Sequence, residues 1–303
     1  MNRIKFKVDE QKDYPIEAHV FETYSQHSST YYRKNAVGEM CHFAVCPACN
    51  GPVQVIGLYK KLANTDRPYA KHVSHSISNL ATYIQENYNY CPFRAKREVY
   101  SKATRKENDG GLHQFIVQKL ISKFDKIILF ISKKTGIFIS LTLAESMLDD
   151  YFSSRAYLYP GSTLLNLPLM LAYFMRSRTL FGRIIQGNEK LEQSLISTKL
   201  IGLKDKKVVN LSNKHKSLTF YFLKHDTILI EHNLTEYVWF EVALDEHVIF
   251  KDKWKFEPDY AENIMNYQYV SNNEKINQRN ATLLDIAKRV AEKYGFRPDL
   301  MGP

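Results

Sequence analysis

The sequence predicts an α+β fold, in which helices and antiparallel strands occupy separate parts of the chain. Aromatic and β-branched runs separated by turn residues fill the last third, which is typical of an antiparallel sheet. Apolar residues recur at helical spacing in the middle of the chain and again near its end. The chain has 303 residues, of which 44% are hydrophobic, so it can bury a sizeable core.

This distribution divides the chain into three regions. Residues 1–110 carry every cysteine and a basic segment, residues 111–195 are expected to be mainly helical, and residues 196–303 are expected to form an antiparallel β region with a C-terminal helix. The Asn-Asp-Gly-Gly run at 108–111 marks the first boundary, because these residue types favour turns and loops.

In the first region we expect a strand at residues 53–59, a turn at 63–68 and a helix at 77–88. The helix prediction depends on apolar residues spaced three and four apart. Ser74 or Ser76 would cap this helix by accepting bonds from its first free backbone N–H groups.

In the second region a capping box predicts a helix start, because Thr142 is followed by Glu145 at the reciprocal position. Pro168 suits the first turn of another helix. The expected elements of this region are a helix at 113–124, a strand at 127–131, an extended segment at 137–140, a helix from 142 and a helix at 164–185.

In the third region the turn residues between apolar runs predict a meander of short strands. Apolar residues at helical spacing then predict a final helix that ends at Gly295. The expected elements are strands at 218–223, 227–230, 237–243 and 247–250 and a helix at 280–294.

The charge of the chain favours a polyanionic partner. Lys and Arg number 42 against 32 Asp and Glu, a net charge of +10, and such an excess attracts phosphates. Two stretches are densely basic, residues 94–106 and 199–216. The first follows directly on the last cysteine.

We expect a cytoplasmic protein without a membrane span. The longest apolar segment, residues 164–174, carries Asn166 and Pro168 and is far shorter than the ~20 residues that a span needs. The first residues alternate basic and apolar side chains and lack the apolar core of a signal peptide. In the cytoplasm thiols stay reduced, so clustered cysteines indicate metal binding.

The spacing of cysteines and histidines predicts a zinc site. Cys46 and Cys49 form a Cys-Pro-x-Cys pair, which can turn two thiolates onto one ion, and Cys91 follows later. Thiolates and imidazole suit zinc better than harder cations. The fourth ligand is a histidine, with His72 preferred and His75 as the alternative or an additional ligand if the backbone there is helical.

Four protein ligands would close the site, which makes the zinc structural, since a catalytic zinc keeps one position open. Cys41 is set aside as a core residue, because it alternates with Phe43 and Val45 along one face of a short strand. We therefore predict the ligands Cys46, Cys49, His72 and Cys91.

The Cys-Pro-x-Cys pair with later His and Cys resembles the zinc-ribbon or treble-clef knuckle of many nucleic-acid-associated bacterial proteins. Over residues 41–93 it is also similar to the N-terminal module of CoiA-type competence proteins. In that family the knuckle precedes a restriction-like nuclease domain, so the resemblance implies a metal-binding Asp and a Glu-x-Lys at a strand end. The sequence departs from this pattern, because Glu274 and Lys275 are adjacent and the strand that holds Glu241 lacks the lysine.

No catalytic residue is assigned. Phosphate-binding glycine loops and the nucleophile elbow are absent from the sequence. Asp245, Glu246 and Asp252 lie near predicted strand ends, where acidic turn residues are common, and the remaining histidines are isolated.

The leading hypothesis is a non-catalytic, zinc-containing protein that binds nucleic acid, either DNA or RNA. Aromatic side chains beside the basic segment, such as Tyr88 and Phe93, could stack on bases or pack the small zinc module. The alternatives are a metal-dependent nuclease with a CoiA-like layout and a protein–protein interaction subunit of a bacterial complex. The expected phosphate contacts are Arg94, Lys96, Arg97, Arg105 and Lys106.

Overall fold

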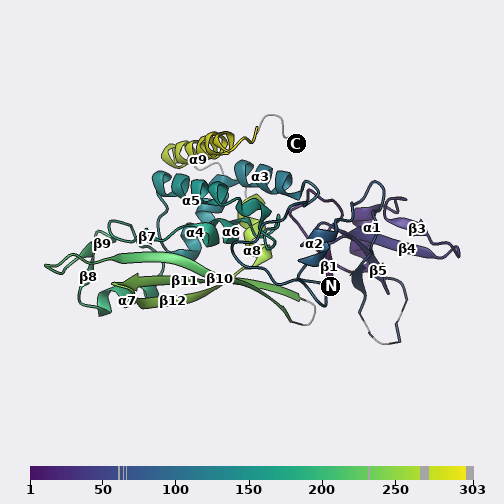
Figure 1. Cartoon of the computed structure of the whole chain (residues 1–303), viewed down its shortest axis with the longest axis horizontal. Helices are drawn as coiled ribbons and strands as arrows, with labels where there is room; N and C mark the ends of the chain where they lie inside the picture. Colours follow the sequence, from purple (N-terminus) through teal and green to yellow (C-terminus); the bar gives the residue numbers. More distant parts are fainter. Residues whose placement is uncertain (61, 64, 66, 231–232, 267–272, 298–303) are drawn as a thin grey trace. The chain divides into compact units, whose positions relative to one another are not determined.

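The computed structural model describes residues 1–60, 62–63, 65, 67–230, 233–266 and 273–297. Over these residues the chain has an α+β fold with antiparallel sheets (Figure 1), which confirms the predicted fold class. It divides into two compact units. The first comprises Met1–Ile116, Leu158–Leu165 and Thr227–Thr235, and the second comprises Val117–Tyr157, Asn166–Asp226 and Glu236–Pro303.

A four-stranded antiparallel sheet with the order β3-β4-β5-β6 forms the centre of the first unit. The predicted strand at 53–59 is confirmed as β5, and it ends at Ile56 because Gly57 takes a left-handed backbone conformation (φ 78°). The elements of this unit are β1 (Arg3–Ile4), β2 (Tyr14–Pro15), α1 (Ala18–Ser25), β3 (Tyr32–Lys34), β4 (Met40–Val45), β5 (Pro52–Ile56), β6 (Tyr69–His72) and α2 (Gln85–Asn89).

The predicted helix at 77–88 is wrong, and only α2 at its end is helical. Ile77 and Ala81 instead bridge in a tight turn, within which Asn79 has a positive φ of 62°. Such a residue interrupts a helix. The turn still buries Ile77, Leu80 and Ala81 against Val45, so the apolar spacing reflects burial without a helix.

The second unit is built on a sheet with the order β12-β11-β10-β7, and Figure 1 shows α4, α6 and α8 over one face of it. The antiparallel β region is confirmed. The strands predicted at 218–223 and 227–230 are one continuous strand, since the positive φ of Lys224 (51°) is accommodated within it. The strands are β7 (Arg178–Thr179), β10 (Leu218–Ile230), β11 (Asn233–Leu244) and β12 (His247–Lys255).

The strand predicted at 127–131 is wrong, because these residues lie inside helix α4. A short apolar run fits a buried helix as well as a strand, and Leu129 is the one residue of the run that the helix exposes. The segment at 137–140 forms only the single bridge between Ile137 and Ile185. Around the sheet lie α3 (Leu112–Ser122), which crosses from the first unit, α4 (Phe124–Thr135), η1 (Ala156–Leu158), α7 (Glu189–Ser197), the pair β8 (Ile201–Lys204) and β9 (Lys207–Asn210), and α8 (Pro258–Asn266).

The helix predicted from Thr142 is α5 (Leu141–Ser153), but its cap is Ser140, whose hydroxyl accepts a bond from the Leu143 N–H. Thr142 therefore lies inside the first turn. Of the helix predicted at 164–185, only residues Leu167–Phe174 form a helix, α6, with Pro168 in its first turn as expected. It ends early because Met175 turns to extended backbone.

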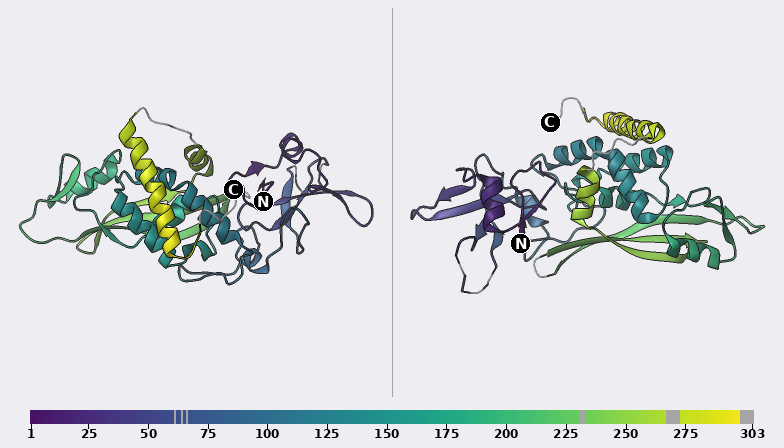
Figure 2. Two further views of the ribbon diagram at one scale, coloured as in Figure 1. Left: turned by 90° about the horizontal axis from the view of Figure 1, so that it is seen from above. Right: turned by 180° about the vertical axis from the view of Figure 1, so that it is seen from behind.

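The predicted C-terminal helix is confirmed as α9 (Glu274–Lys293), which starts earlier than expected because Asn273 caps it. It lies across α5 and α4 (Figure 2) and buries Leu283, Ile286 and Val290. Among the residues described, no helix combines the length and apolarity that a membrane crossing requires.

Candidate metal centre

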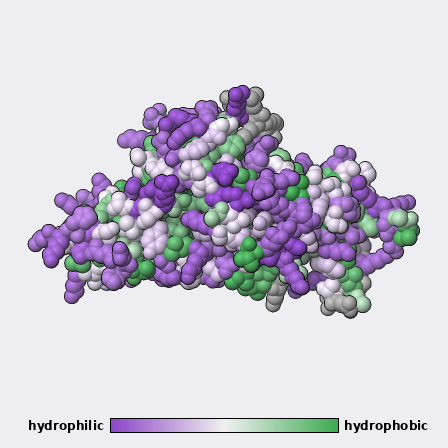
Figure 3. Space-filling model, viewed as in Figure 1, coloured by the Kyte–Doolittle hydropathy of each residue, from purple (hydrophilic) through white to green (hydrophobic). Residues whose placement is uncertain are grey.

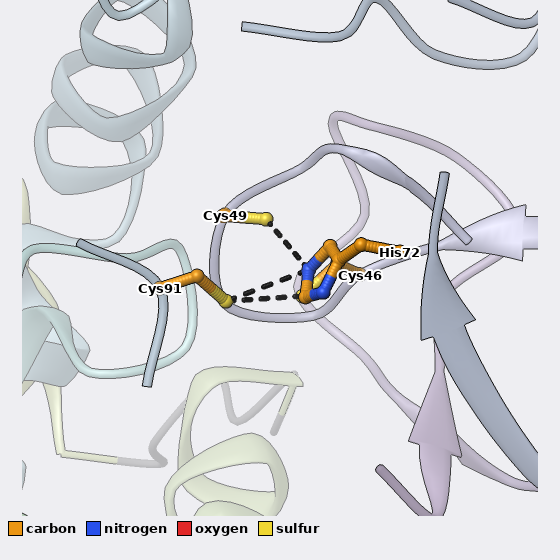
Figure 4. Close-up of side chains that lie close together, drawn as sticks. All are labelled: Cys46, Cys49, His72 and Cys91. Carbon is orange, nitrogen blue, oxygen red and sulfur yellow. Dashed lines mark hydrogen bonds between the residues drawn. The ribbon is translucent and has the colours of Figure 1, made fainter. Parts of the chain in front are cut away.

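Four separate elements of the first unit place their side chains at one point (Figure 4). Cys46 follows strand β4, Cys49 lies in the turn before β5, His72 is the last residue of β6, and Cys91 lies just beyond α2. Since β4, β5 and β6 are antiparallel neighbours, the turn between β4 and β5 lies at the same end of the sheet as the last residue of β6. The donor atoms of these four residues all lie within 4.8 Å of one another.

The separations between these atoms match the edges of a zinc tetrahedron. With Zn–S near 2.3 Å and Zn–N near 2.0 Å, tetrahedral geometry requires about 3.8 Å between two sulfurs and about 3.5 Å between sulfur and nitrogen. Sγ of Cys46 and Sγ of Cys91 are 3.8 Å apart. Nε2 of His72 lies 3.3 Å from Sγ of Cys49 and 3.6 Å from Sγ of Cys91. All four cysteines of the chain are free thiols, so no disulfide competes for these sulfurs.

The turn between Cys46 and Gly51 is fixed by its own backbone. The Cys46 N–H donates to the Gly51 carbonyl and the Asn50 N–H donates to the Cys46 carbonyl, at 2.8 and 3.1 Å. Asn50 supplies the left-handed residue that closes the turn (φ 58°). The Gly51 N–H points at Sγ of Cys49, 3.4 Å away, and a Cβ at Gly51 would lie 3.3 Å from the same sulfur.

The three sulfurs are buried in the core of the first unit, together with Phe21, Val53 and other apolar side chains. Burial alone disfavours both the His72 cation and a thiolate. Against that effect, the Cys46 thiolate raises the pKa of His72 to about 11. Burial likewise opposes ionisation of Cys46, but hydrogen bonds from Cys49 and Cys91 and the charge of His72 take the pKa of Cys46 well below its usual value.

The pKa values of the other two thiols are shifted upward, which favours their protonated form. The hydrogen bond with Cys46 raises the pKa of Cys49, and burial raises the pKa of Cys91 well above its usual value. The protein thus stabilises one thiolate with one imidazolium. A divalent cation bound here would displace the remaining protons and take over the role of the charge on His72.

A fully buried lysine lies beside the cluster. The ammonium group of Lys5 donates to the Asn50 side chain, 2.5 Å away, and to the Val8 carbonyl, 3.2 Å away. Burial lowers the pKa of Lys5 to about 8, although Cys46 and Glu10 oppose this. Three thiolates and a divalent ion leave the site with one negative charge, which a neighbouring ammonium group offsets.

The other cysteine and histidine considered from the sequence lie apart from the cluster. His75 is exposed, and His72 is the last residue of a strand. Because the backbone is not helical there, only one of the two histidines was expected to bind the metal. Cys41 is half-buried in β4 and does not belong to the group of four.

The basic segment after Cys91 has a mixed environment. Arg94 bonds to Asn89 and lies over the ring of Tyr88, and Arg97 donates to Thr227. Arg105 is half-buried and donates to the carbonyl groups of residues 102 and 104. Lys96 is exposed, whereas Lys106 is 4% exposed and donates to the side chain of Asn87. Lys106 is therefore not available to an external partner.

Sequence reasoning missed Lys5 and Asn50 as parts of the site. The sequence carried only a weak signal for Asn50, an asparagine directly before Gly51, which is a usual turn pair. Nothing local identifies Lys5, since an alternating basic and apolar terminus predicts exposed lysines.

The donor set of three thiolates and one imidazole, buried and at tetrahedral spacing, fits a four-coordinate structural zinc. The comparisons with known proteins add no family: no protein-family model, no curated protein and no solved structure matches the chain. The geometry of the chain itself defines the class of site, a candidate Cys3His metal centre in an α+β protein.

Proposed function

We propose that the protein binds nucleic acid without catalysis, and that a structural zinc held by Cys46, Cys49, His72 and Cys91 fixes the basic segment that contacts the phosphates. The observation that carries this proposal is that Tyr88 connects the first arginine of that segment to a ligand. Tyr88 lies against the His72 ring, at 5.1 Å between ring centroids, and Arg94 lies 4.9 Å over the ring of Tyr88.

The backbone makes the same connection. The Cys91 N–H donates to the Tyr88 carbonyl, and the Arg94 N–H donates to the Cys91 carbonyl at 3.0 Å. A metal that holds Cys91 therefore also holds the turn that presents Arg94. Ordering the cations before binding lowers the entropic cost of contacting a phosphate backbone.

Within the segment, Lys96 and Lys102 are exposed, and Arg94, Arg97 and Arg105 are half-buried with their guanidinium groups held by neighbours. Cations of this kind give affinity for any phosphate backbone and little preference for sequence. We therefore expect binding that falls steeply with salt and differs little between oligonucleotide sequences.

The test uses fluorescence anisotropy with the zinc-loaded full chain and a labelled 20-base-pair duplex. We expect Arg94→Glu and Lys96→Glu each to weaken binding several-fold and to reduce the salt slope. Lys288→Glu, the same charge change at an exposed position of α9, is the matched control. Equal binding by all four proteins, or no binding at low salt, would refute the proposal.

One observation favours the protein–protein alternative. Apolar side chains gather at several places on the face drawn in Figure 3, and three consecutive ones, Ile228, Leu229 and Ile230, are 39%, 44% and 57% exposed. Ile228 and Ile230 share one face of β10 because side chains alternate along a strand, and contiguous exposed apolar surface is a feature of interaction sites. A partner that co-purifies with the native chain, and is lost in Ile230→Ser, would support this function.

The structure offers no comparable support for the nuclease alternative. The buried Glu241 carboxylate is paired with Lys251 at 2.7 Å, and Asp245 is paired with Lys216 at 2.6 Å.

A further inference from the structure

The two faces of strand β11 carry different chemistry. Val238 and Phe240 point to the core, where Phe240 stacks with Phe222 of β10 at 5.2 Å. Because side chains alternate along a strand, Tyr237 and Trp239 lie on the opposite face, and both are only half-buried. Two large aromatic side chains are therefore accessible on the face that is not used for the core.

The neighbouring strand β12 supplies a lysine opposite each outer residue of β11. The register pairs Tyr237 with Lys255, Trp239 with Lys253, and Glu241 with Lys251. Residues directly opposite in antiparallel strands share a face. A row of three lysines on the edge strand thus runs beside a row of two aromatic rings and one carboxylate.

The rings and the ammonium groups are in contact. The rings of Tyr237 and Trp239 lie 6.5 Å apart between centroids, near the spacing of alternate residues in a strand. Nζ of Lys253 lies 3.5 Å from the ring centroid of Tyr237, and Nζ of Lys251 lies 4.5 Å from that of Trp239. We call Tyr237, Trp239, Lys251, Lys253 and Lys255 the aromatic–lysine face.

Within the second unit three helices, α4, α6 and α8, lie on the other side of this sheet (Figure 1). Phe130 of α4 stacks on Trp254, whose ring belongs to the core face, at 5.9 Å. The half-exposed rings and the exposed Lys251 and Lys255 on the aromatic–lysine face are thus directed away from the core of the unit.

From this arrangement we infer that the aromatic–lysine face binds single-stranded nucleic acid, by stacking two bases on Tyr237 and Trp239 while the lysines contact the phosphates. Aromatic side chains on an open sheet stack unpaired bases, and lysines beside them neutralise the backbone. A duplex does not fit this chemistry, because its base faces are covered. This surface belongs to the second unit, whereas the basic segment after Cys91 belongs to the first.

Stabilisation of the sheet alone does not account for the charge of the aromatic–lysine face. Cross-strand lysine–aromatic pairs do stabilise sheets. Three lysines, however, outnumber the two carboxylates found at this face, which are Glu241, paired with Lys251, and Asp226, which accepts a bond from the Tyr237 hydroxyl. The face therefore carries a net positive charge that a bound anion would offset. The charge excess selects a polyanion that also carries flat apolar groups, and single-stranded DNA or RNA is that partner.

The chain has two tryptophans, which gives a direct readout. In the Trp254→Phe protein, Trp239 is the only source of tryptophan fluorescence. We expect titration with unlabelled dT15 or rU15 to quench this fluorescence, and a 15-base-pair duplex not to quench it. Comparing dT15 with rU15 shows whether the face prefers single-stranded DNA or single-stranded RNA.

Anisotropy with labelled dT15 and rU15 then measures the energetics in the full, zinc-loaded chain. Trp239→Leu, which keeps an apolar residue in the strand, should weaken binding about ten-fold, and Lys253→Glu should weaken it and lower the salt slope. Lys288→Glu is the control for charge, and circular dichroism checks that each variant is folded.

Unquenched Trp239 fluorescence with both oligonucleotides, or equal affinity of Trp239→Leu and the unaltered chain, overturns the inference. So does concentration-dependent self-association that Trp239→Leu abolishes, since the face would then be an interface between copies. Arg94→Glu alters the basic segment only, so it should weaken duplex binding and leave the quenching of Trp239 unchanged. If duplex binding fails in every protein while quenching persists, only the proposed function is refuted. If quenching fails while duplex binding persists, only the present inference is refuted.

Discussion

The ring of Tyr88 packs edge-on against the imidazole of His72, with ring centroids 5.1 Å apart and planes inclined by 66°. His72 is a proposed metal ligand and Tyr88 belongs to α2, so this contact joins the centre to the helix that precedes Cys91. The helix and the basic segment after it are consequently held in place from two sides, by a ligand sulfur and by a ring on a ligand imidazole.

Replacing Tyr88 by leucine should separate metal binding from nucleic-acid binding. The four donor atoms remain, so we expect zinc content to be unchanged by elemental analysis. Arg94 loses the ring beneath it, a contact of about 0.5–1 kcal/mol at an exposed site, so duplex affinity by anisotropy should fall several-fold. Tyr90→Leu is the matched control, since its ring contacts Tyr100 instead of a ligand. Equal losses in both variants would show that the effect is not specific to His72.

The cysteines should divide into two classes. Cys46→Ser and Cys91→Ser are expected to lose one zinc per chain and to unfold the first unit, because the binding free energy of a structural metal is folding free energy. Cys41→Ser should keep both the metal and the fold. Elemental analysis and thermal unfolding of the three variants check this. A chain that is fully folded and free of metal after expression with ample zinc would contradict it.

The ammonium group of Lys5 should increase the affinity of the site for zinc. Lys5→Met removes the ammonium group that offsets the negative thiolate site but keeps a side chain of similar length. We expect zinc affinity to fall by about ten-fold, the lower end of what outer partners of a metal site contribute. Competition with a coloured chelator measures this, and the exposed Lys7→Met is the control. An affinity that rises in Lys5→Met would mean that the ammonium group acts mainly by repelling the ion.

Asp109 should make stability depend on pH in the acid range. Its carboxylate accepts bonds from the Gly111 and His113 N–H groups and contacts the His113 ring at 2.7 Å. Burial opposes its charge, but His113 and Lys106 outweigh burial and lower its pKa. A carboxyl group with a lowered folded-state pKa contributes stability above its unfolded pKa of about 3.9, and loses it as pH falls through the folded value.

Asp109→Asn therefore should be less stable than the unaltered chain by about 1–3 kcal/mol near neutral pH. The difference should stay constant down to about pH 5 and shrink below about pH 4. Urea unfolding of both proteins at several pH values measures it. A difference that grows with acid would contradict the assigned direction of the shift.

The grouping of the four donors was accessible from sequence because a Cys-x-x-Cys turn and a strand return impose local geometry. The choice of His72 over His75 depended on the backbone between them, which only the structure supplies. The burial of Lys5 could not be predicted, because it depends on the pairing of Lys5 with Val45, which lies 40 residues away in the sequence.

The errors in the fold have a common physical source. The apolar run at 127–131 fits both a strand and a helix, and packing of α4 against α6 and α9 decided between them. In the segment at 77–81, tertiary burial against Val45 satisfied the apolar residues without a helix. Longer periodic patterns, such as α9 and the strands of the last third, were recognisable because their spacing extends over several turns or repeats.

The first compact unit is assembled from three separate stretches of the chain, and β10 passes from the second unit into the first. A fragment that ends at Ile116 would hold all four donor residues of the metal centre, but it would lack two stretches of the first unit, Leu158–Leu165 and Thr227–Thr235. We therefore expect the metal centre to be less stable in such a fragment than in the full chain.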